Sequence, residues 1–188
     1  QEETHGLFPA RRALLLLLPL WLLLVGGILF TGGLQMRSLC GAGFAAVLLW
    51  LSYLDVRDGL LYDVITLPFA AVGFLFSLTG VLMPVANAVI GGTLCGVLFY
   101  CLYIAARGGL GGGDVKFAAG LGLWLGWEAA VIALWIAFML GGTAAAVLLI
   151  TGRRKRHDGI PFGPFLALGG YIGFIAGDYL WRLYWGTG

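Results

Sequence analysis

The chain alternates between long apolar stretches and short polar breaks, a pattern typical of membrane-crossing helices. A crossing needs about 20 apolar residues, because the hydrocarbon layer is about 30 Å thick and each helical residue rises about 1.5 Å. Stretches of about this length occupy residues 13–31, 38–54, 64–83, 85–106, 129–151 and 160–185. One further apolar stretch, residues 115–126, is short for a crossing.

Basic residues decide how the short stretch is placed, because Lys and Arg favour cytoplasmic loops. They gather at residues 11–12, 57, 107–116 and 153–156. All of these segments lie on the cytoplasmic side only if residues 115–151 cross twice, turning near Trp127 and Glu128. We therefore predict an all-α bundle of about seven transmembrane helices, with the N-terminus cytoplasmic and the C-terminus outside.

Composition supports a membrane protein with little mass outside the bilayer. Of the 188 residues, 61% are hydrophobic and 11% are charged, and the mean hydropathy is +0.98. Soluble domains are about 45–50% apolar and about 25% charged. We expect residues 1–188 to form a single transmembrane domain in contact with lipids, and we expect no nucleic-acid partner.

Cysteine and histidine positions limit the chemistry. Cys40, Cys95 and Cys101 lie in apolar stretches without a CxxC pair, and His5 and His157 flank the stretches. A zinc-protease H-E-x-x-H motif is absent. A serine protease that uses histidine as its base has no histidine inside the apolar stretches.

A carboxyl group follows three glycines at one membrane edge, in the segment Gly111, Gly112, Gly113 and Asp114. An ionisable group there is costly and suggests function. Glycines let another backbone come close, as a peptide substrate must. The alternative is that Asp114 only caps the helix that follows the turn.

A second carboxyl strengthens the functional interpretation. Asp55 ends the stretch 38–54 on the same predicted side as Asp114, so both lie at similar depth. Two carboxyls that share a site cannot both ionise cheaply, and one keeps its proton. The charged member then takes a proton from water while the neutral one donates to a peptide carbonyl, as in an aspartic protease.

Three motifs in this order resemble those of the type IV prepilin peptidases, which are polytopic membrane aspartic proteases of the GxGD kind. Residues 111–117 match the GxGD element and its continuation. Residues 55–68 follow a D-x6-P-N/D element with an L-P tail, except that Tyr62 stands where the family usually has proline. Residues 160–167 resemble the late PFGP element.

The resemblance implies that Asp55 and Asp114 form the catalytic dyad, without a metal. Asp58 is the second candidate for the first catalytic position, and Asp63 is expected to cap the third helix. Residues expected to bind substrate or shape the site are Gly111, Gly112, Gly113, Lys116, Asp58, Asp63, Pro161, Gly163 and Pro164.

The remaining charged residues have simpler interpretations. Lys116 is expected to reach lipid phosphates, with a role in holding Asp114 ionised as the alternative. Asp158 is expected to cap the last helix. Asp178 is expected to pair with Arg182 one helical turn further on.

The resemblance also implies a reaction. Family members remove the short basic leader from type IV prepilins and from pseudopilins of type II secretion, at the cytoplasmic face of the bacterial inner membrane. The substrate's apolar helix is then the expected partner. Many members also methylate the new terminus with S-adenosylmethionine and carry a cytoplasmic segment with two CxxC pairs, which these residues do not contain.

Two other functions fit a small helical membrane protein with paired acids. One is a proton-coupled transporter, since carboxyls inside membranes also mark ion pathways. The other is a non-catalytic partner in a membrane assembly, which leaves Asp55 and Asp114 without a purpose.

Overall fold

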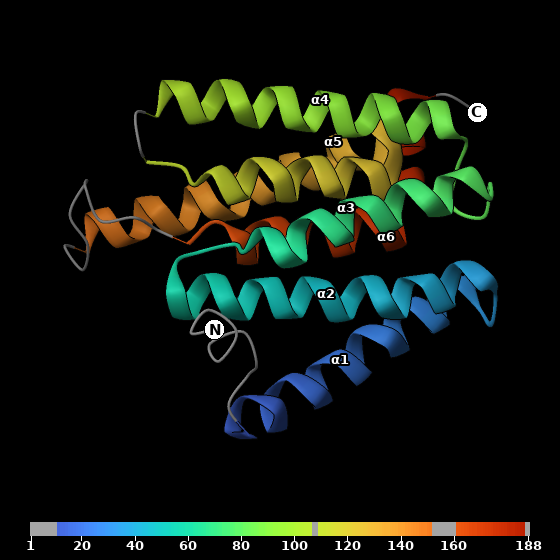
Figure 1. Cartoon of the computed structure of the whole chain (residues 1–188), viewed down its shortest axis with the longest axis horizontal. Helices are drawn as coiled ribbons and strands as arrows, with labels where there is room; N and C mark the ends of the chain where they lie inside the picture. Colours follow the sequence, from blue (N-terminus) through green and yellow to red (C-terminus); the bar gives the residue numbers. More distant parts are fainter. Residues whose placement is uncertain (1–10, 107–108, 152–160, 187–188) are drawn as a thin grey trace.

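The computed structural model describes residues 11–106, 109–151 and 161–186. These residues form an all-α bundle without strands, as predicted (Figure 1). The helices are α1 (Arg11–Gly32), α2 (Met36–Asp58), α3 (Asp63–Leu78), α4 (Val85–Ala105), α5 (Gly112–Ile150) and α6 (Gly163–Trp185).

Four helical segments have the length and composition to cross a membrane. They are Ala13–Gly32, Met36–Asp58, Val85–Ala105 and Gly112–Ile150. Helix α3 is apolar but has only 16 residues. It is shorter than the predicted stretch 64–83, because a turn at Gly80, where φ is +68°, follows its end. The protein is a multi-pass membrane protein by these criteria.

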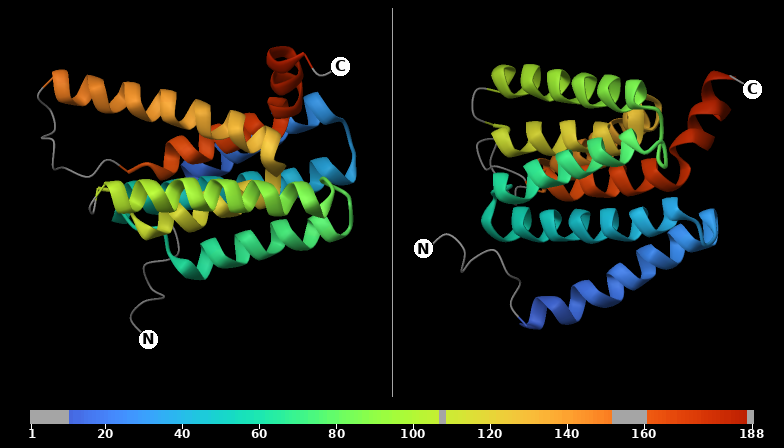
Figure 2. Two further views of the ribbon diagram at one scale, coloured as in Figure 1. Left: turned by 90° about the horizontal axis from the view of Figure 1, so that it is seen from above. Right: turned by 45° about the vertical axis from the view of Figure 1, so that its right-hand side comes forward.

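Helix α5 is interrupted at Gly126, where φ is 74° and ψ is 172°. The two arms on either side run back along each other (Figures 1 and 2). Gly91 of α4 approaches Gly122 of the first arm, and Phe99 of α4 stacks on Phe138 of the second. The break lies one residue before the turn predicted near Trp127 and Glu128, so the two arms correspond to the predicted hairpin. With α5 counted as one divided helix, the described residues contain six helices, and the predicted count of about seven is not confirmed.

One end of the bundle gathers the ends of α2, α4 and α5 and the starts of α3, α5 and α6 (Figures 1 and 2). We call it the site end. The α1–α2 turn and the α3–α4 turn lie at the opposite end. Gly126 adjoins the α3–α4 turn, since a Cβ atom on it would lie 2.7 Å from the sulfur of Met83. The described parts of the predicted cytoplasmic segments therefore share one end. That this end faces the cytoplasm, and where the termini lie, stay predictions from the charge pattern.

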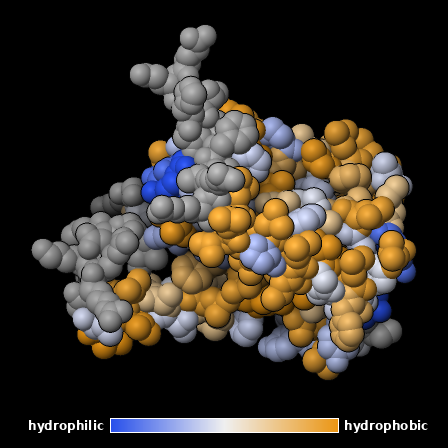
Figure 3. Space-filling view, turned by 90° about the horizontal axis from the view of Figure 1, so that it is seen from below, coloured by the Kyte–Doolittle hydropathy of each residue, from blue (hydrophilic) through white to orange (hydrophobic). Residues whose placement is uncertain are grey.

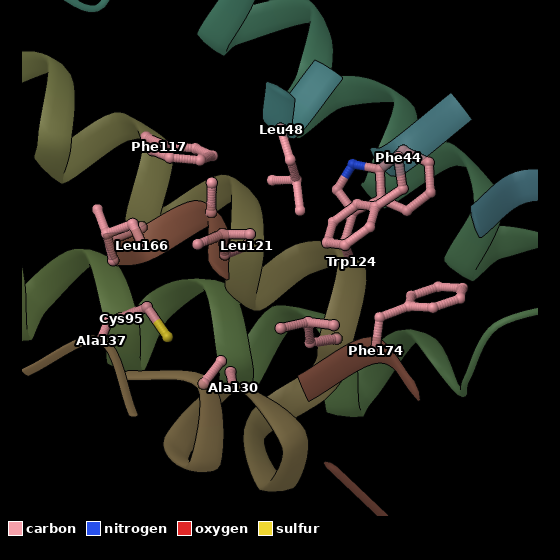
Figure 4. Packing of buried hydrophobic residues seen from close by; sticks show 14 of the residues in the cluster. Phe44, Leu48, Cys95, Phe117, Leu121, Trp124, Ala130, Ala137, Leu166 and Phe174 are labelled. Carbon is pink, nitrogen blue, oxygen red and sulfur yellow. The ribbon is translucent and has the colours of Figure 1, made fainter. Parts of the chain in front are cut away.

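Aromatic side chains join the helices that carry the site (Figure 4). The ring of Phe44 on α2 lies 5.1 Å from that of Trp124 on α5 and 5.2 Å from that of Phe174 on α6. The indole N–H of Trp124 donates a 2.8 Å hydrogen bond to the carbonyl oxygen of Phe69 on α3. Aromatic pairs of this kind contribute about 0.5–1.5 kcal/mol beyond their burial. Helices α2, α3, α5 and α6 are thereby held in register.

The outer surface is mostly apolar. Figure 3 shows hydrophobic residues spread over much of one face of the molecule. Helix α1 contributes strongly, with Leu15 72% and Leu16 74% exposed, and it packs mainly against α2. A monomeric soluble protein rarely exposes so large an apolar area, so this surface fits contact with lipid.

Candidate active site

Asp55 lies in the last turn of α2 and is 5% exposed. Its Oδ2 accepts a 2.7 Å hydrogen bond from the backbone N–H of Gly163 at the start of α6. The sequence predicted that Asp55 ends the second apolar stretch, and the helix extends three residues further. The helix continues through Asp58 because Gly59, with φ of 66°, is the residue that takes up the left-handed conformation which ends it.

Asp114 is the third residue of α5 and is 8% exposed. Its Oδ2 accepts a 3.1 Å hydrogen bond from the N–H of Gly111, and its own N–H donates to the Gly111 carbonyl. Asp114 therefore does stabilise the start of α5, as the capping alternative proposed. Capping occupies only one oxygen. The other, Oδ1, is buried and has no hydrogen-bond partner among the described residues.

The fold brings the two carboxyls together. Asp55 lies near enough to Asp114 for its charge to act on that carboxyl. Both are buried at the site end. A glycine amide holds each one, from the start of α6 for Asp55 and from the residue before its own helix for Asp114. A buried, unpartnered carboxylate oxygen beside a second carboxyl is costly in a folded protein, which is a reason to assign the pair a chemical task.

Gly163 allows α6 to approach Asp55. A Cβ atom at this position would lie 2.7 Å from Asp55 Oδ2 and 3.0 Å from Asp55 Cβ, closer than atoms pack. Pro164 stands in the first turn of α6, and Pro161 precedes the helix. The predicted role of these prolines in shaping the helix start is consistent with this placement.

The loop between α2 and α3 lies against the glycine segment. A Cβ atom on Gly113 would meet Leu61 Cβ at 2.6 Å and the Leu61 carbonyl oxygen at 2.7 Å. The same atom on Gly112 would meet nothing within 4 Å, and on Gly111 it would lie 3.2 Å from Asp114 Oδ2. The third glycine is therefore the one that close packing requires.

Lys116 and Asp63 form an ion pair at the site end, with Nζ 2.5 Å from Oδ2. One prediction was wrong here. Asp63 is the first residue of α3 and not its cap, since Tyr62 occupies the cap position without a side-chain bond. Lys116 pairs with Asp63 because the starts of α3 and α5 lie side by side. The expectation that Lys116 reaches lipid phosphates stays a prediction.

Asp58, the second candidate for the first catalytic position, is bound by its chain neighbours. Its Oδ2 lies 2.6 Å from the Arg57 guanidinium and accepts a 3.3 Å hydrogen bond from the Tyr62 hydroxyl. Tyr62, which stands at the family's proline position, thus ties the loop back to the end of α2. These contacts are consistent with a role for Asp58 in stabilising the loop.

At the opposite end, Asp178 pairs with Arg37 at 3.3 Å, and the predicted pair with Arg182 is wrong. The start of α2 packs against α6, where the Arg37 guanidinium also lies 5.5 Å from the centre of the Phe174 ring. Asp158 lies outside the described residues.

Sequence reasoning missed the two contacts that hold the site, namely the Gly163 amide on Asp55 and Leu61 on Gly113. The glycine of the PFGP element was the available signal for the first. No group of three or more His, Cys, Asp or Glu side chains within residues 11–106, 109–151 and 161–186 is arranged to hold a metal ion. The expectation that proteolysis needs no cofactor stays a prediction.

The chain was compared with models of known protein families. Residues 42–146, more than half of the chain, match the model of the type IV leader peptidase family. This range includes both Asp55 and Asp114. The match does not favour a transporter or a non-catalytic assembly partner.

Curated relatives agree with the family match. A prepilin leader peptidase/N-methyltransferase of Aeromonas salmonicida is 36% identical over 146 residues, covering 75% of this chain and 50% of the relative. Proteins of the same name from Burkholderia pseudomallei and Neisseria gonorrhoeae are 39% identical over 158 residues and 34% identical over 167 residues. These alignments cover 78% and 85% of this chain and 51% and 56% of the relatives. The chain spans about half the length of the curated relatives it matches. No solved structure gives a significant match.

Proposed function

The chain belongs to the type IV leader peptidase family, and on that premise we propose that it is a membrane aspartic endopeptidase with Asp55 and Asp114 as its catalytic dyad. Its substrates are type IV prepilins or pseudopilins of type II secretion, from which it removes the short basic leader. Cleavage takes place at the cytoplasmic face of the bacterial inner membrane. The observation that carries the proposal is the meeting of two buried carboxyls at the site end.

In the proposed reaction, one carboxylate takes a proton from water, and the water oxygen attacks the carbonyl carbon of the scissile bond. The other carboxyl, protonated, donates its proton to the carbonyl oxygen. The tetrahedral intermediate then returns that proton to the second carboxyl as the carbon–nitrogen bond breaks. The leaving nitrogen takes up the proton that the first carboxyl had removed from water.

The arrangement of hydrogen bonds supports the assignment of one carboxyl as base and the other as acid. Gly163 and Gly111 each donate a backbone N–H to one oxygen, Oδ2, of Asp55 and Asp114 respectively. Each carboxyl is therefore oriented while its other oxygen is left for the reaction. Oδ1 of Asp114, buried and unpaired among the described residues, is the atom best placed to bind the attacking water or the substrate. Orientation by backbone amides costs no reorganisation during the reaction.

The position of the site fits a substrate with one membrane helix. Both carboxyls lie at the site end, where helices α2, α4 and α5 end or begin and an apolar outer surface adjoins them. A substrate helix lying in lipid beside the bundle would present its cut site at this depth. Carboxyls at one end, rather than midway along the helices, are the arrangement expected of a protease that acts at the membrane boundary.

The test is the replacement of each acid by its isosteric amide. Asp55→Asn and Asp114→Asn are each expected to lower the rate of prepilin cleavage by roughly 10³-fold or more, because general acid–base catalysis alone contributes about 10²–10⁴. Asp178→Asn, at the opposite end of the bundle, is the matched control and is expected to cleave normally. Cleavage is measured as conversion of a purified prepilin in phospholipid vesicles. Wild-type rates in either dyad variant would end the proposal.

A further inference from the structure

An apolar pocket of about 430 Å³ opens at the site end. Its walls come from four parts of the chain that are distant in sequence. The lining side chains are Leu102, Ala105 and Ala106 at the end of α4, Leu110 before α5, Phe138 in the second arm of α5, and Phe162 before α6. Pockets that bind small ligands have volumes of about 300–1,000 Å³, so this one has room for a large side chain.

Two of the lining residues are chain neighbours of the groups that hold the carboxyls. Leu110 directly precedes Gly111, whose N–H binds Asp114. Phe162 directly precedes Gly163, whose N–H binds Asp55. A residue rises about 3.3 Å in an extended chain. A peptide bond held at the two carboxyls therefore has its flanking side chains within reach of this pocket.

The aromatic wall of the pocket is fixed by packing. The ring of Phe162 lies 5.5 Å from that of Phe138 and 6.0 Å from that of Phe99. Phe99 is fully buried and stacks on Phe138 at 5.6 Å. Side chains held in this way give a pocket a defined shape, which is the requirement for discriminating between substrates of different size.

From this arrangement we infer that the pocket is the specificity site for the residue that directly follows the cut. The inference rests on the proposed function. In that reaction the leader side of the substrate is basic, and the side that follows the cut begins an apolar helix. None of the charged side chains described at this end lines the pocket. Lys116, for example, forms an ion pair with Asp63. An apolar side chain from the helix side is therefore the occupant that the pocket favours.

The small residues Ala105 and Ala106 leave the space open at the end of α4. Filling that space obstructs a large side chain but not a small one. The test therefore compares prepilins that differ only in the residue after the cut, which is Phe, Trp or Ala. The measured quantity is kcat/KM for each prepilin with the full chain in phospholipid vesicles.

Ala105→Phe is expected to lower the ratio of kcat/KM for the Phe substrate over the Ala substrate at least about tenfold, the scale on which apolar pockets discriminate. Ala146→Phe changes an exposed alanine of the second arm of α5 that does not line the pocket, and it is the matched control. Its ratio is expected to equal that of the wild type.

A second variant tests the inference independently, in case Ala105→Phe does not fold. Phe138→Ala enlarges the pocket and is expected to raise the ratio of kcat/KM for the Trp substrate over the Phe substrate. Ratios unchanged in both variants, or rates that fall equally for all substrates, overturn the inference while the dyad proposal stands. A wild-type chain that cuts no prepilin at all overturns the proposed function itself, together with the pocket that depends on it.

Discussion

The backbone N–H of Gly163 donates a 2.7 Å hydrogen bond to Oδ2 of Asp55, across a separation of 108 residues. This contact links the start of α6 to the last turn of α2, and it gives the PFGP element a physical role. A side chain at position 163 has no space, since its Cβ would lie 2.7 Å from the same oxygen. The glycine therefore lets a backbone amide reach a buried carboxyl and orient it.

Gly163→Ala is expected to lower prepilin cleavage by about 10²-fold, because a shift of about 1 Å in a catalytic group has effects of this size. The chain is expected to remain folded, since the new methyl group displaces only the start of α6 and Asp55. The measurement is kcat in vesicles together with the unfolding midpoint in detergent. Gly26→Ala, where an added Cβ meets nothing within 4 Å, is the control and is expected to be active. Full activity of the Gly163 variant would show that the amide does not position the acid.

The ion pair between Lys116 and Asp63 is expected to contribute to the stability of the protein and not to change the catalytic carboxyls Asp55 and Asp114. Its side chains are 43% and 54% exposed, so solvent screens the pair, and its coupling energy is expected to be about 0.2–1 kcal/mol. A double-mutant cycle with Lys116→Gln and Asp63→Asn measures this coupling from unfolding in detergent, and added salt is expected to reduce it.

The same variants separate two roles for Lys116. If its partner is Asp63 alone, Lys116→Gln leaves cleavage unchanged once Asp63→Asn is already present. A further loss of cleavage in the double variant would mean that the lysine acts on Asp114 directly, and the interpretation given by the structure would be wrong.

The break in α5 depends on Gly126, whose φ of 74° and ψ of 172° lie in a region open mainly to glycine. Gly126→Ala is expected to destabilise the protein by about 1–3 kcal/mol, the usual cost of such a conformation for another residue. Its Cβ would also lie 2.7 Å from the sulfur of Met83. The measurement is the free energy of unfolding in detergent.

Gly142→Ala serves as the control for this experiment, because it lies within the second arm of α5 and its Cβ would meet nothing within 4 Å. Alanine is favoured over glycine inside a helix by about 1 kcal/mol, so this variant is expected to be neutral or slightly more stable. Equal stability of the two alanine variants would contradict the need for a glycine at the turn.

The sequence by itself determined the fold class, the positions of most helices and the two carboxyls that meet. It did so because the length of an apolar run and the charge of its flanks act locally, and because the motifs around Asp55 and Asp114 are short. The turn in residues 115–151 was also foreseen, from charge balance, within a residue of Gly126.

Only the tertiary structure decided the partners of Asp55, Asp63 and Asp178. Asp63 binds Lys116, Asp178 binds Arg37, and Asp55 binds the Gly163 amide, and each partner comes from another helix. Local spacing favours partners one turn away, such as Arg182 for Asp178, but close packing of helices places distant residues nearer. The pocket at the site end has the same origin, since its lining from Leu102 to Phe162 is assembled only when α4, α5 and α6 pack together.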